Sequence, residues 1–274
     1  MLPLKALSRA ALVGAALLLA LPAAGETARD DHPCRNLQPH ADLSGASLGI
    51  ALPGLAARVA AGQRLRIVVL GSSSTAGPNP DDRSRTYPAA AARTLQRRWG
   101  SKAVEVVNKG VGGEAVPEML RRFDSDIYAL KPDLVVWQLG VNDLFRFSQT
   151  EIAGLEPAIR KAVHDMRARG IPVILLDLQY APRVLRAASH DAMEGMIGRV
   201  AKQENAGLFQ RFDLMQRLAG NAAGAAGLTE KDGLHMTEGV HACIGRLLGE
   251  QVAASAAQAP RQELAGQIHA ARPQ

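Results

Sequence analysis

The sequence has few aromatic residues, only two cysteines and no block of like charge. Aromatic residues make up 4% of the 274 residues. Two cysteines exclude a small scaffold held together by several disulfides, and a hydrophobic content of 47% excludes a disordered chain. The 32 basic and 26 acidic residues leave a net charge of +6, spread along the chain. Because no basic stripe is interleaved with aromatic residues, the composition argues against nucleic-acid binding.

The N-terminus has the pattern of a targeting segment. Lys5 and Arg9 precede an uncharged stretch over 10–25 that ends in small residues, which is typical of a cleaved signal peptide over residues 1–25. The alternative is a membrane anchor, but the apolar run is shorter than the roughly 20 residues that a spanning helix needs. We therefore expect a periplasmic or secreted protein that has no stable membrane insertion after cleavage.

Short apolar runs alternate with helical stretches along the rest of the chain. The apolar runs are typical of buried parallel strands and cover 66–70, 103–107, 134–137, 173–176 and 207–209. The helical stretches cover 87–99, 118–130 and 150–169, and a last helix begins after Thr237, a good N-cap. This alternation predicts an α/β fold in which helices cover both faces of a parallel sheet of about five strands.

One domain accounts for this pattern, since no linker or internal repeat divides it. We expect an N-terminal arm with a helix over 26–64, a domain over 65–254 and a disordered tail over 255–274. Residues 220–227 are rich in Ala and Gly and predict a flexible loop.

The two cysteines, Cys34 and Cys243, allow two interpretations. In an oxidising compartment they can form one disulfide between the N-terminal arm and the last helix. Alternatively, Cys243 is a buried free thiol, because it shares a helical face with Val240 and Leu247. The sequence leaves both open.

Small and polar residues follow the predicted strands, where a parallel sheet binds its ligands. The first strand is followed by Gly71–Gly77, the second by Asn108–Gly113 and the third by Gly140–Asp143. A fourth group, Asp232–His235, precedes the last helix.

In this order, the four groups resemble the SGNH branch of the GDSL esterase and lipase family, over roughly residues 66–252. The resemblance implies a three-layer α/β/α sandwich with a flavodoxin-like sheet, so that 65–254 would be the hydrolase domain. It implies a Ser73 nucleophile, a His235 base and an Asp232 that orients His235. The implied oxyanion hole consists of the backbone N–H groups of Ser73 and Gly113 and the Asn142 amide. No cofactor and no metal are implied.

The chemistry of these residue types supports the resemblance. A serine hydroxyl becomes a good nucleophile only when a base takes its proton, and a neutral histidine suits that task. A carboxylate on the other ring nitrogen fixes the tautomer of the histidine and stabilises its protonated form. The sequence departs from the family at Ser72, which stands where the signature aspartate is expected. Since that aspartate is not the triad acid, hydrolysis remains compatible with this change.

Other interpretations of the same residues are weaker. A Ser/Thr cluster before a helix often serves as a cap, and 110–115 spells a dinucleotide-type Gly-x-Gly-x-x-Ala, although after the second strand rather than the first. A metal site could combine Asp232, His235 and His241, but no further clustered ligand supports it, and we expect His241 to be solvated. We expect Trp137 and Phe145 to pack in the core or in a pocket wall.

The function predicted from the sequence is hydrolysis of carboxylic esters through an acyl-serine intermediate. The partner would be a small-molecule or glycan ester, and the low aromatic content favours short acyl or acetyl groups. One alternative is an acyltransferase that O-acetylates a cell-envelope glycan with the same triad. Another is a non-catalytic glycan-binding module, which the missing aspartate at Ser72 would permit.

Overall fold

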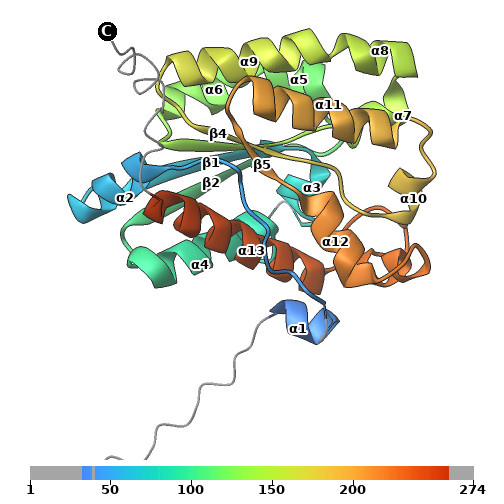
Figure 1. The fold of residues 1–274 in the computed structure, drawn as a ribbon, viewed down its shortest axis with the longest axis horizontal. Helices are drawn as coiled ribbons and strands as arrows, with labels where there is room; N and C mark the ends of the chain where they lie inside the picture. The colour runs from blue at the N-terminus through green and yellow to red at the C-terminus, as the bar shows by residue number, and fades with distance from the viewer. Residues whose placement is uncertain (1–32, 39–40, 80, 259–274) are drawn as a thin grey trace, which may run out of the picture. The chain divides into compact units, whose positions relative to one another are not determined.

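Five parallel strands form the centre of the molecule, in the spatial order β2-β1-β3-β4-β5 (Figure 1). The chain leaves β1 toward one edge of the sheet and returns to add β3 on the other side, so the strand order reverses at β1. In such sheets, ligands bind beyond the carboxyl ends of the strands at this reversal. The strands are β1 (Leu65–Gly71), β2 (Val104–Gly110), β3 (Leu134–Gln138), β4 (Val173–Leu176) and β5 (Gly207–Phe209).

This computed structural model describes residues 33–38, 41–79 and 81–258. The expected signal peptide over 1–25 and the part of the expected tail beyond 258 lie outside the described residues. Among the helices of the described part, none combines the length and the apolar character that crossing a membrane requires.

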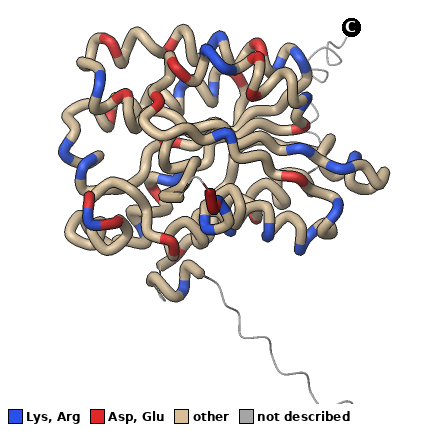
Figure 2. Tube along the Cα trace, turned by 180° about the vertical axis from the view of Figure 1, so that it is seen from behind, with Lys and Arg blue, Asp and Glu red and all other residues tan. Residues whose placement is uncertain are grey.

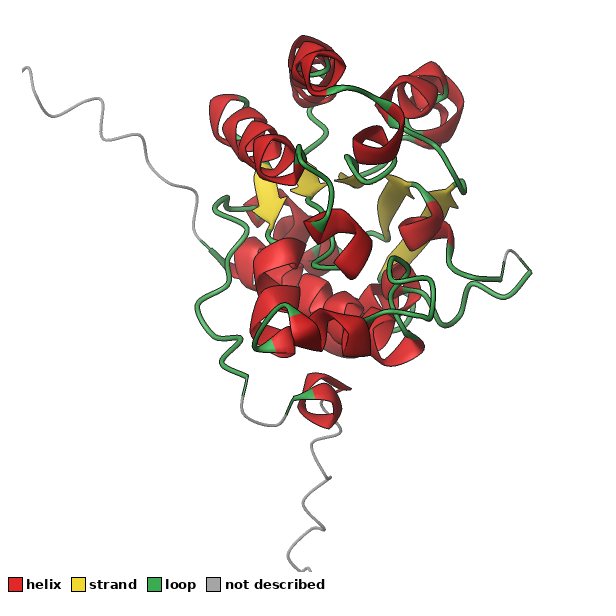
Figure 3. Ribbon diagram, turned by 90° about the vertical axis from the view of Figure 1, so that its right-hand side faces the viewer, coloured by secondary structure: helices red, strands yellow, loops and turns green. Residues whose placement is uncertain are grey.

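Successive residues of the central strands face two separate hydrophobic cores. In β1, Ile67 and Val69 belong to one core, whereas Val68 and Leu70 belong to the other. Both faces are therefore covered, which explains why these strands are continuous apolar runs. Helices α4 (Tyr87–Trp99) and α13 (Glu238–Ala257) cover one face, and α9 (Glu156–Ala168) and α11 (His190–Gln203) cover the other (Figure 1). Figure 3 shows helices on both sides of the strands. The expected α/β three-layer architecture is confirmed.

The N-terminal arm is attached to the last helix. Helix α1 (Pro33–Leu37) packs on α13, and the structure contains the Cys34–Cys243 disulfide rather than two free thiols. Further along, the backbone N–H of Leu52 donates to the Ser255 carbonyl, and α2 (Pro53–Ala60) leads into β1. The arm thus contacts both ends of α13.

Two helices that the sequence predicts as continuous are broken. Within 118–130, a first helix ends at Arg121, because the backbone of Arg122 is not helical, with φ −109° and ψ 14°. The stretch 150–169 is interrupted at Leu155, just before Pro157, which has no backbone N–H to donate to the preceding turn. These segments form α5 (Val116–Arg121), α6 (Phe123–Asp126), the 3₁₀ helix η1 (Tyr128–Leu130) and α8 (Gln149–Gly154), followed by α9.

The C-terminal part of the chain differs from its prediction in two places, and the elements not yet named are mostly single turns. The predicted flexible loop over 220–227 overlaps the 3₁₀ helix η2 (Ala223–Leu228), in which Ala225 and Leu228 are buried. Helix α13 extends to Ala257, three residues past the expected domain end. The other elements are α3 (Ser73–Ala76), α7 (Asp143–Arg146), α10 (Pro182–Leu185) and the longer α12 (Arg211–Ala219).

Candidate active site

Ser73 is the first residue of the one-turn helix α3, directly after β1. Ser72 is extended, and its carbonyl accepts hydrogen bonds from the N–H groups of Thr75 and Ala76, which closes the turn. Gly110, at the end of the neighbouring strand, must be glycine here, because a Cβ would collide with the backbone of Ala76. This close approach fixes α3 against β2 and leaves the Ser73 side chain half-buried.

His235 lies between Ser73 and Asp232. Its Nε2 is 2.8 Å from the Ser73 Oγ, and its Nδ1 is 2.5 Å from the Asp232 Oδ2. The other oxygen of Asp232 accepts the backbone N–H groups of Leu234 and His235, at 2.9 and 3.0 Å. When Nδ1 carries the proton and donates it to Asp232, Nε2 is the atom that accepts the Ser73 hydroxyl proton.

The surroundings of the Asp232 carboxyl favour its ionised form. Partial burial raises its pKa, but the backbone N–H of Leu234 and the ring and N–H of His235 outweigh this and bring the pKa below its ordinary value. A carboxylate that stays charged favours the protonated form of the histidine it contacts.

Gly113 and Asn142 lie on the loops after β2 and β3, the two neighbours of β1. Gly113 has φ +80°, a conformation that favours glycine. The Asn142 Nδ2 donates one hydrogen to the Glu114 carbonyl at 2.8 Å, which leaves its second hydrogen for another acceptor. Among the backbone hydrogen bonds of the described residues, none is donated by the N–H of Ser73 or Gly113. The three expected oxyanion donors therefore lie at one edge of the sheet.

Gln138, the last residue of β3, supports the segment around Ser73 through hydrogen bonds to Ser72 and Thr75. Its Oε1 accepts the N–H of Ser72 at 2.8 Å, the Ser72 Oγ at 3.0 Å and the Thr75 Oγ1 at 3.2 Å. Thr75 is bonded in turn to the Tyr87 hydroxyl at 2.7 Å. Sequence reasoning missed Gln138. The available signal was a glutamine that ends an otherwise apolar strand.

The Gly113 loop is held by groups from α5 and α7. Asp143, next to Asn142, is buried, and its Oδ1 accepts the N–H of Val116 at 3.0 Å. Burial raises the pKa of Asp143, and the Val116 hydrogen bond opposes that effect. Asp143 therefore connects the Asn142 loop to the start of α5.

Arg146 and Glu118 form a second support of the same loop. The two guanidinium nitrogens of Arg146 contact the two Glu118 oxygens at 2.9 and 2.8 Å, and Nη1 also reaches the Gly113 carbonyl at 3.3 Å. Glu118 accepts the N–H of Ala115 at 3.0 Å. The hydrogen bond from Arg146 is the main reason that the pKa of Glu118 is lowered to about 2.

The site is open at its rim. The side chains of Asp232 and His235 are 40% and 41% exposed. Phe145 is one of two large hydrophobic side chains exposed in the described residues, the other being Val111, and the Arg183 guanidinium lies 4.9 Å from the centre of its ring. Phe145 is thus exposed on the one-turn helix α7 that follows Asn142, whereas Trp137 is fully buried in the core.

The prediction of a solvated His241 is wrong. Its side chain is buried between α13 and α4, and its Nδ1 accepts the backbone N–H of Tyr87 at 3.3 Å. Burial, together with the positive charge of Arg211, lowers the pKa of His241 to about 4. His241 is therefore a buried residue that accepts a backbone hydrogen bond, and the described residues contain no group of three His, Cys, Asp or Glu that could hold a metal ion.

One cavity within the described residues lies away from Ser73 and His235. This cavity, of about 1150 Å³, lies at the opposite edge of the sheet, where Lys131–Asp133 and Gly170–Pro172 precede β3 and β4. Basic and acidic residues are interspersed around the described fold (Figure 2).

The five predicted site residues belong to a region that matches a known protein family. The Non-GDSL lipase-like family matches residues 41–258. The chain belongs to this family. Membership places it among SGNH/GDSL-type carboxylic ester hydrolases, which confirms the expected family and enzyme class.

Two curated relatives have similar sequences. The chain is 32% identical to the esterase TesA of Pseudomonas aeruginosa over 147 residues, which are 52% of this chain and 67% of TesA. It is 37% identical to an acetylxylan esterase of Geobacillus stearothermophilus over 60 residues, which are 22% of this chain and only 27% of that relative.

Solved structures share the fold. The acetylxylan esterase Axe2 of Geobacillus stearothermophilus superposes with a TM-score of 0.57 at 19% identity, over 69% of this chain and 94% of Axe2. The acetyl xylan esterase AlAXEase has the same TM-score and identity, over 70% of this chain and 99% of its own. At this identity, the likeness concerns the α/β fold.

Proposed function

We propose that this protein hydrolyses carboxylic esters through an acyl-serine intermediate formed on Ser73. The observation that carries the proposal is the continuous hydrogen-bonded chain from Ser73 through His235 to Asp232. This arrangement of nucleophile, base and orienting carboxylate is the one that activates a serine hydroxyl at neutral pH.

Each residue has one role in the proposed reaction. The Ser73 Oγ attacks the ester carbonyl carbon while its proton passes to the His235 Nε2. Collapse of the tetrahedral intermediate breaks the bond to the alcohol, which leaves with the proton from His235. Water then attacks the acyl-serine, loses its proton to His235 and releases the acid, and Ser73 recovers its proton. Asp232 holds the imidazole in place and stabilises its charge in both halves.

The negative oxygen of each tetrahedral intermediate needs preorganised donors. The N–H groups of Ser73 and Gly113 and the free hydrogen of the Asn142 amide supply them from the ends of β1, β2 and β3. Their fixed placement supports this role, because donors that need no reorganisation contribute most to lowering a barrier.

Replacing Ser73 with Ala tests the proposal. We expect hydrolysis of 4-nitrophenyl acetate to fall about 10⁴-fold or more, and a fluorophosphonate probe to leave the intact mass unchanged. Ser74→Ala is the matched control, because Ser74 is buried and its Oγ contacts Gln179 rather than His235. It should keep activity and labelling. Full activity of Ser73→Ala would refute the assignment.

We further propose that the substrates are short-chain esters, such as acetyl groups on a glycan. The acetylxylan esterase of Geobacillus stearothermophilus supports the acyl group, although the matched region is short. The exposed rim with Phe145 and Arg183 suits a bulky alcohol portion, since an aromatic ring offers a flat apolar surface to a sugar. A series of 4-nitrophenyl esters from acetate to decanoate should show kcat/KM falling with length, and a rising series would contradict the proposal.

Hydrolysis and acyl transfer share the acyl-serine intermediate, so products distinguish them. With an acetyl ester and a xylo-oligosaccharide present together, a hydrolase releases acetate, whereas a transferase acetylates the oligosaccharide. A non-catalytic glycan-binding protein would bind the oligosaccharide and resist the fluorophosphonate probe. Mass spectrometry of the sugar and of the protein therefore separates the three functions.

We also propose that the protein is exported, with residues 1–25 as the signal peptide. The Cys34–Cys243 disulfide supports export, because such bonds persist in oxidising compartments and are rare in the cytosol. Cell fractionation followed by N-terminal sequencing should find the mature chain outside the cytoplasm, beginning near residue 26. A full-length chain confined to the cytoplasm would contradict this.

A further inference from the structure

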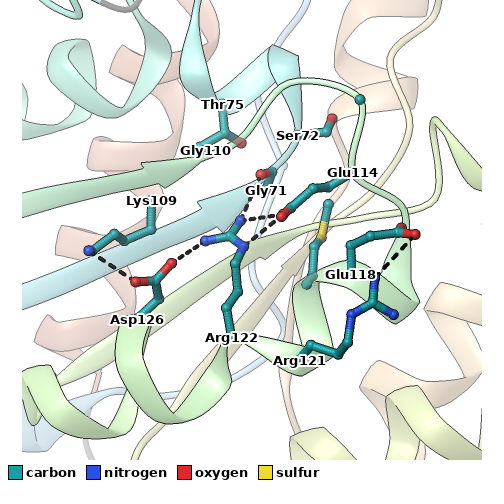
Figure 4. Close-up of polar contacts among 12 residues, drawn as sticks. Gly71, Ser72, Thr75, Lys109, Gly110, Glu114, Glu118, Arg121, Arg122 and Asp126 are labelled. Atoms are coloured by element: carbon teal, nitrogen blue, oxygen red, sulfur yellow. Dashed lines mark hydrogen bonds and ion pairs between the residues drawn. The ribbon is translucent and has the colours of Figure 1, made fainter.

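Arg122 lies at the centre of a network of ion pairs beside the loop that carries Gly113 and Glu114 (Figure 4). Its Nε and Nη2 both contact the Glu114 Oε2 at 2.7 Å, and its Nη1 contacts the Asp126 Oδ2 at 2.5 Å. Nη2 also lies 3.3 Å from the Gly71 carbonyl, to which it donates. The Arg122 side chain is only 14% exposed, so these contacts are made largely away from water.

The network is balanced in charge and extends to β2. Lys109, near the end of β2, contacts the second oxygen of Asp126 at 3.1 Å, which gives two basic and two acidic residues (Figure 4). Burial raises the pKa of Asp126, but Arg122 and Lys109 outweigh it and keep the pKa below its usual value. A buried cation in such a network holds its position, because leaving it would strand unpaired charges.

The partners of Arg122 are adjacent to all three proposed oxyanion donors. Gly71 precedes Ser73 by two residues, and Glu114 directly follows Gly113. The Glu114 carbonyl is also the acceptor of the Asn142 amide. One guanidinium therefore joins the nucleophile loop to the residue that anchors the other two donors.

We propose that Arg122 is a positioning residue of the oxyanion hole, which sets the distance between the Ser73 loop and the Gly113–Asn142 pair. This inference rests on the proposed ester hydrolysis. Arg122 acts through Glu114 and Gly71 and does not itself contact the substrate. A planar guanidinium is needed, because its donors point in fixed directions to a carboxylate, a second carboxylate and a carbonyl at once.

The tests are Arg122→Gln and Arg122→Lys, with Arg66→Gln as the matched control. Arg66 lies at the opposite end of β1, where it also contacts a carboxylate, Glu105, at 3.1 Å and a backbone carbonyl, of Leu130, at 2.8 Å. For 4-nitrophenyl acetate, we expect kcat of Arg122→Gln to fall about 10- to 100-fold, the loss typical of a misplacement near 1 Å, while KM changes little. Arg122→Lys should rescue little, since an ammonium cannot reach all three acceptors. Arg66→Gln should retain kcat.

A double-mutant cycle with Asn142→Ala separates positioning from general stability. If Arg122 acts through the donors, the loss in the double variant is smaller than the product of the two single losses, because the second change removes a donor already misplaced. Independent, multiplicative losses would overturn the proposal, as would an Arg122→Gln protein with wild-type kcat. If Arg122→Gln does not fold, Glu114→Gln, which keeps the side-chain shape, takes its place in the cycle. A wild-type protein that hydrolyses no ester would instead defeat the proposed function itself.

Discussion

Reduction of the Cys34–Cys243 disulfide is expected to remove about 5 kcal/mol from the free energy of unfolding. The two cysteines are 209 residues apart, so the bond closes almost the whole described chain into one loop. Treated as loop closure, a cross-link over that span lowers the entropy of the unfolded chain by roughly 18 cal/mol/K. The folded state gains from the bond because the unfolded state loses more freedom than the folded one.

Urea denaturation of the oxidised and the reduced protein, followed by circular dichroism, measures this difference. Comparing the two forms of one sequence keeps every side chain constant, and intact mass after alkylation verifies the redox state. The Cys34→Ala/Cys243→Ala protein gives a second comparison without reductant, with an added loss from the buried Cys243 side chain. A difference under about 1 kcal/mol would refute the loop-closure reasoning, since it would mean that α1 detaches before the domain unfolds.

Two further predictions concern the site and its surroundings. Asn142→Ala should lower kcat for a short ester about 100- to 1000-fold by removing one oxyanion donor, in steady-state assays of a protein with an unchanged circular dichroism spectrum. A loss under threefold would exclude Asn142 from the oxyanion hole. His241 should make folding sensitive to mild acid. Its folded pKa of about 4 lies below the ordinary 6.5, so the unfolded chain binds more protons between these values. The contribution of His241 is fully present above about pH 6.5 and is lost as the pH falls toward 4, at most about 3 kcal/mol. Denaturation curves from pH 4 to 7 should therefore show that the free energy of unfolding of His241→Asn changes less with pH than that of the wild type. An equal pH dependence would contradict the buried neutral histidine.

The strands could be predicted from local pattern, whereas the site residues were selected by the resemblance to the family. Strand residues buried on both faces form continuous apolar runs, and helix α4 was predicted with its bounds as observed, Tyr87–Trp99. Ser73, Gly113, Asn142 and the Asp232–His235 pair follow their elements in the expected order, because loops at one edge of a parallel sheet converge.

What the sequence could not reveal depends on contacts between distant segments. His241 was assigned to solvent from the apolar face of α13, but that helix is buried on several sides by α1, α4 and the sheet. The break at Arg122 has a similar origin, since the partners that hold this arginine lie on other segments. Gln138 was overlooked for the same reason, because its role exists only once β3 lies beside β1.

The proposed triad spans 162 residues of sequence between Ser73 and His235. A ribosome therefore finishes the proposed nucleophile, the sheet and most of the helices long before it makes the proposed base. A polypeptide truncated before residue 232 lacks the group proposed to take the Ser73 proton, and it also lacks Cys243 to anchor the N-terminal arm. We therefore expect ester cleavage only from chains extended past His235, and closure of the arm only from chains extended past Cys243.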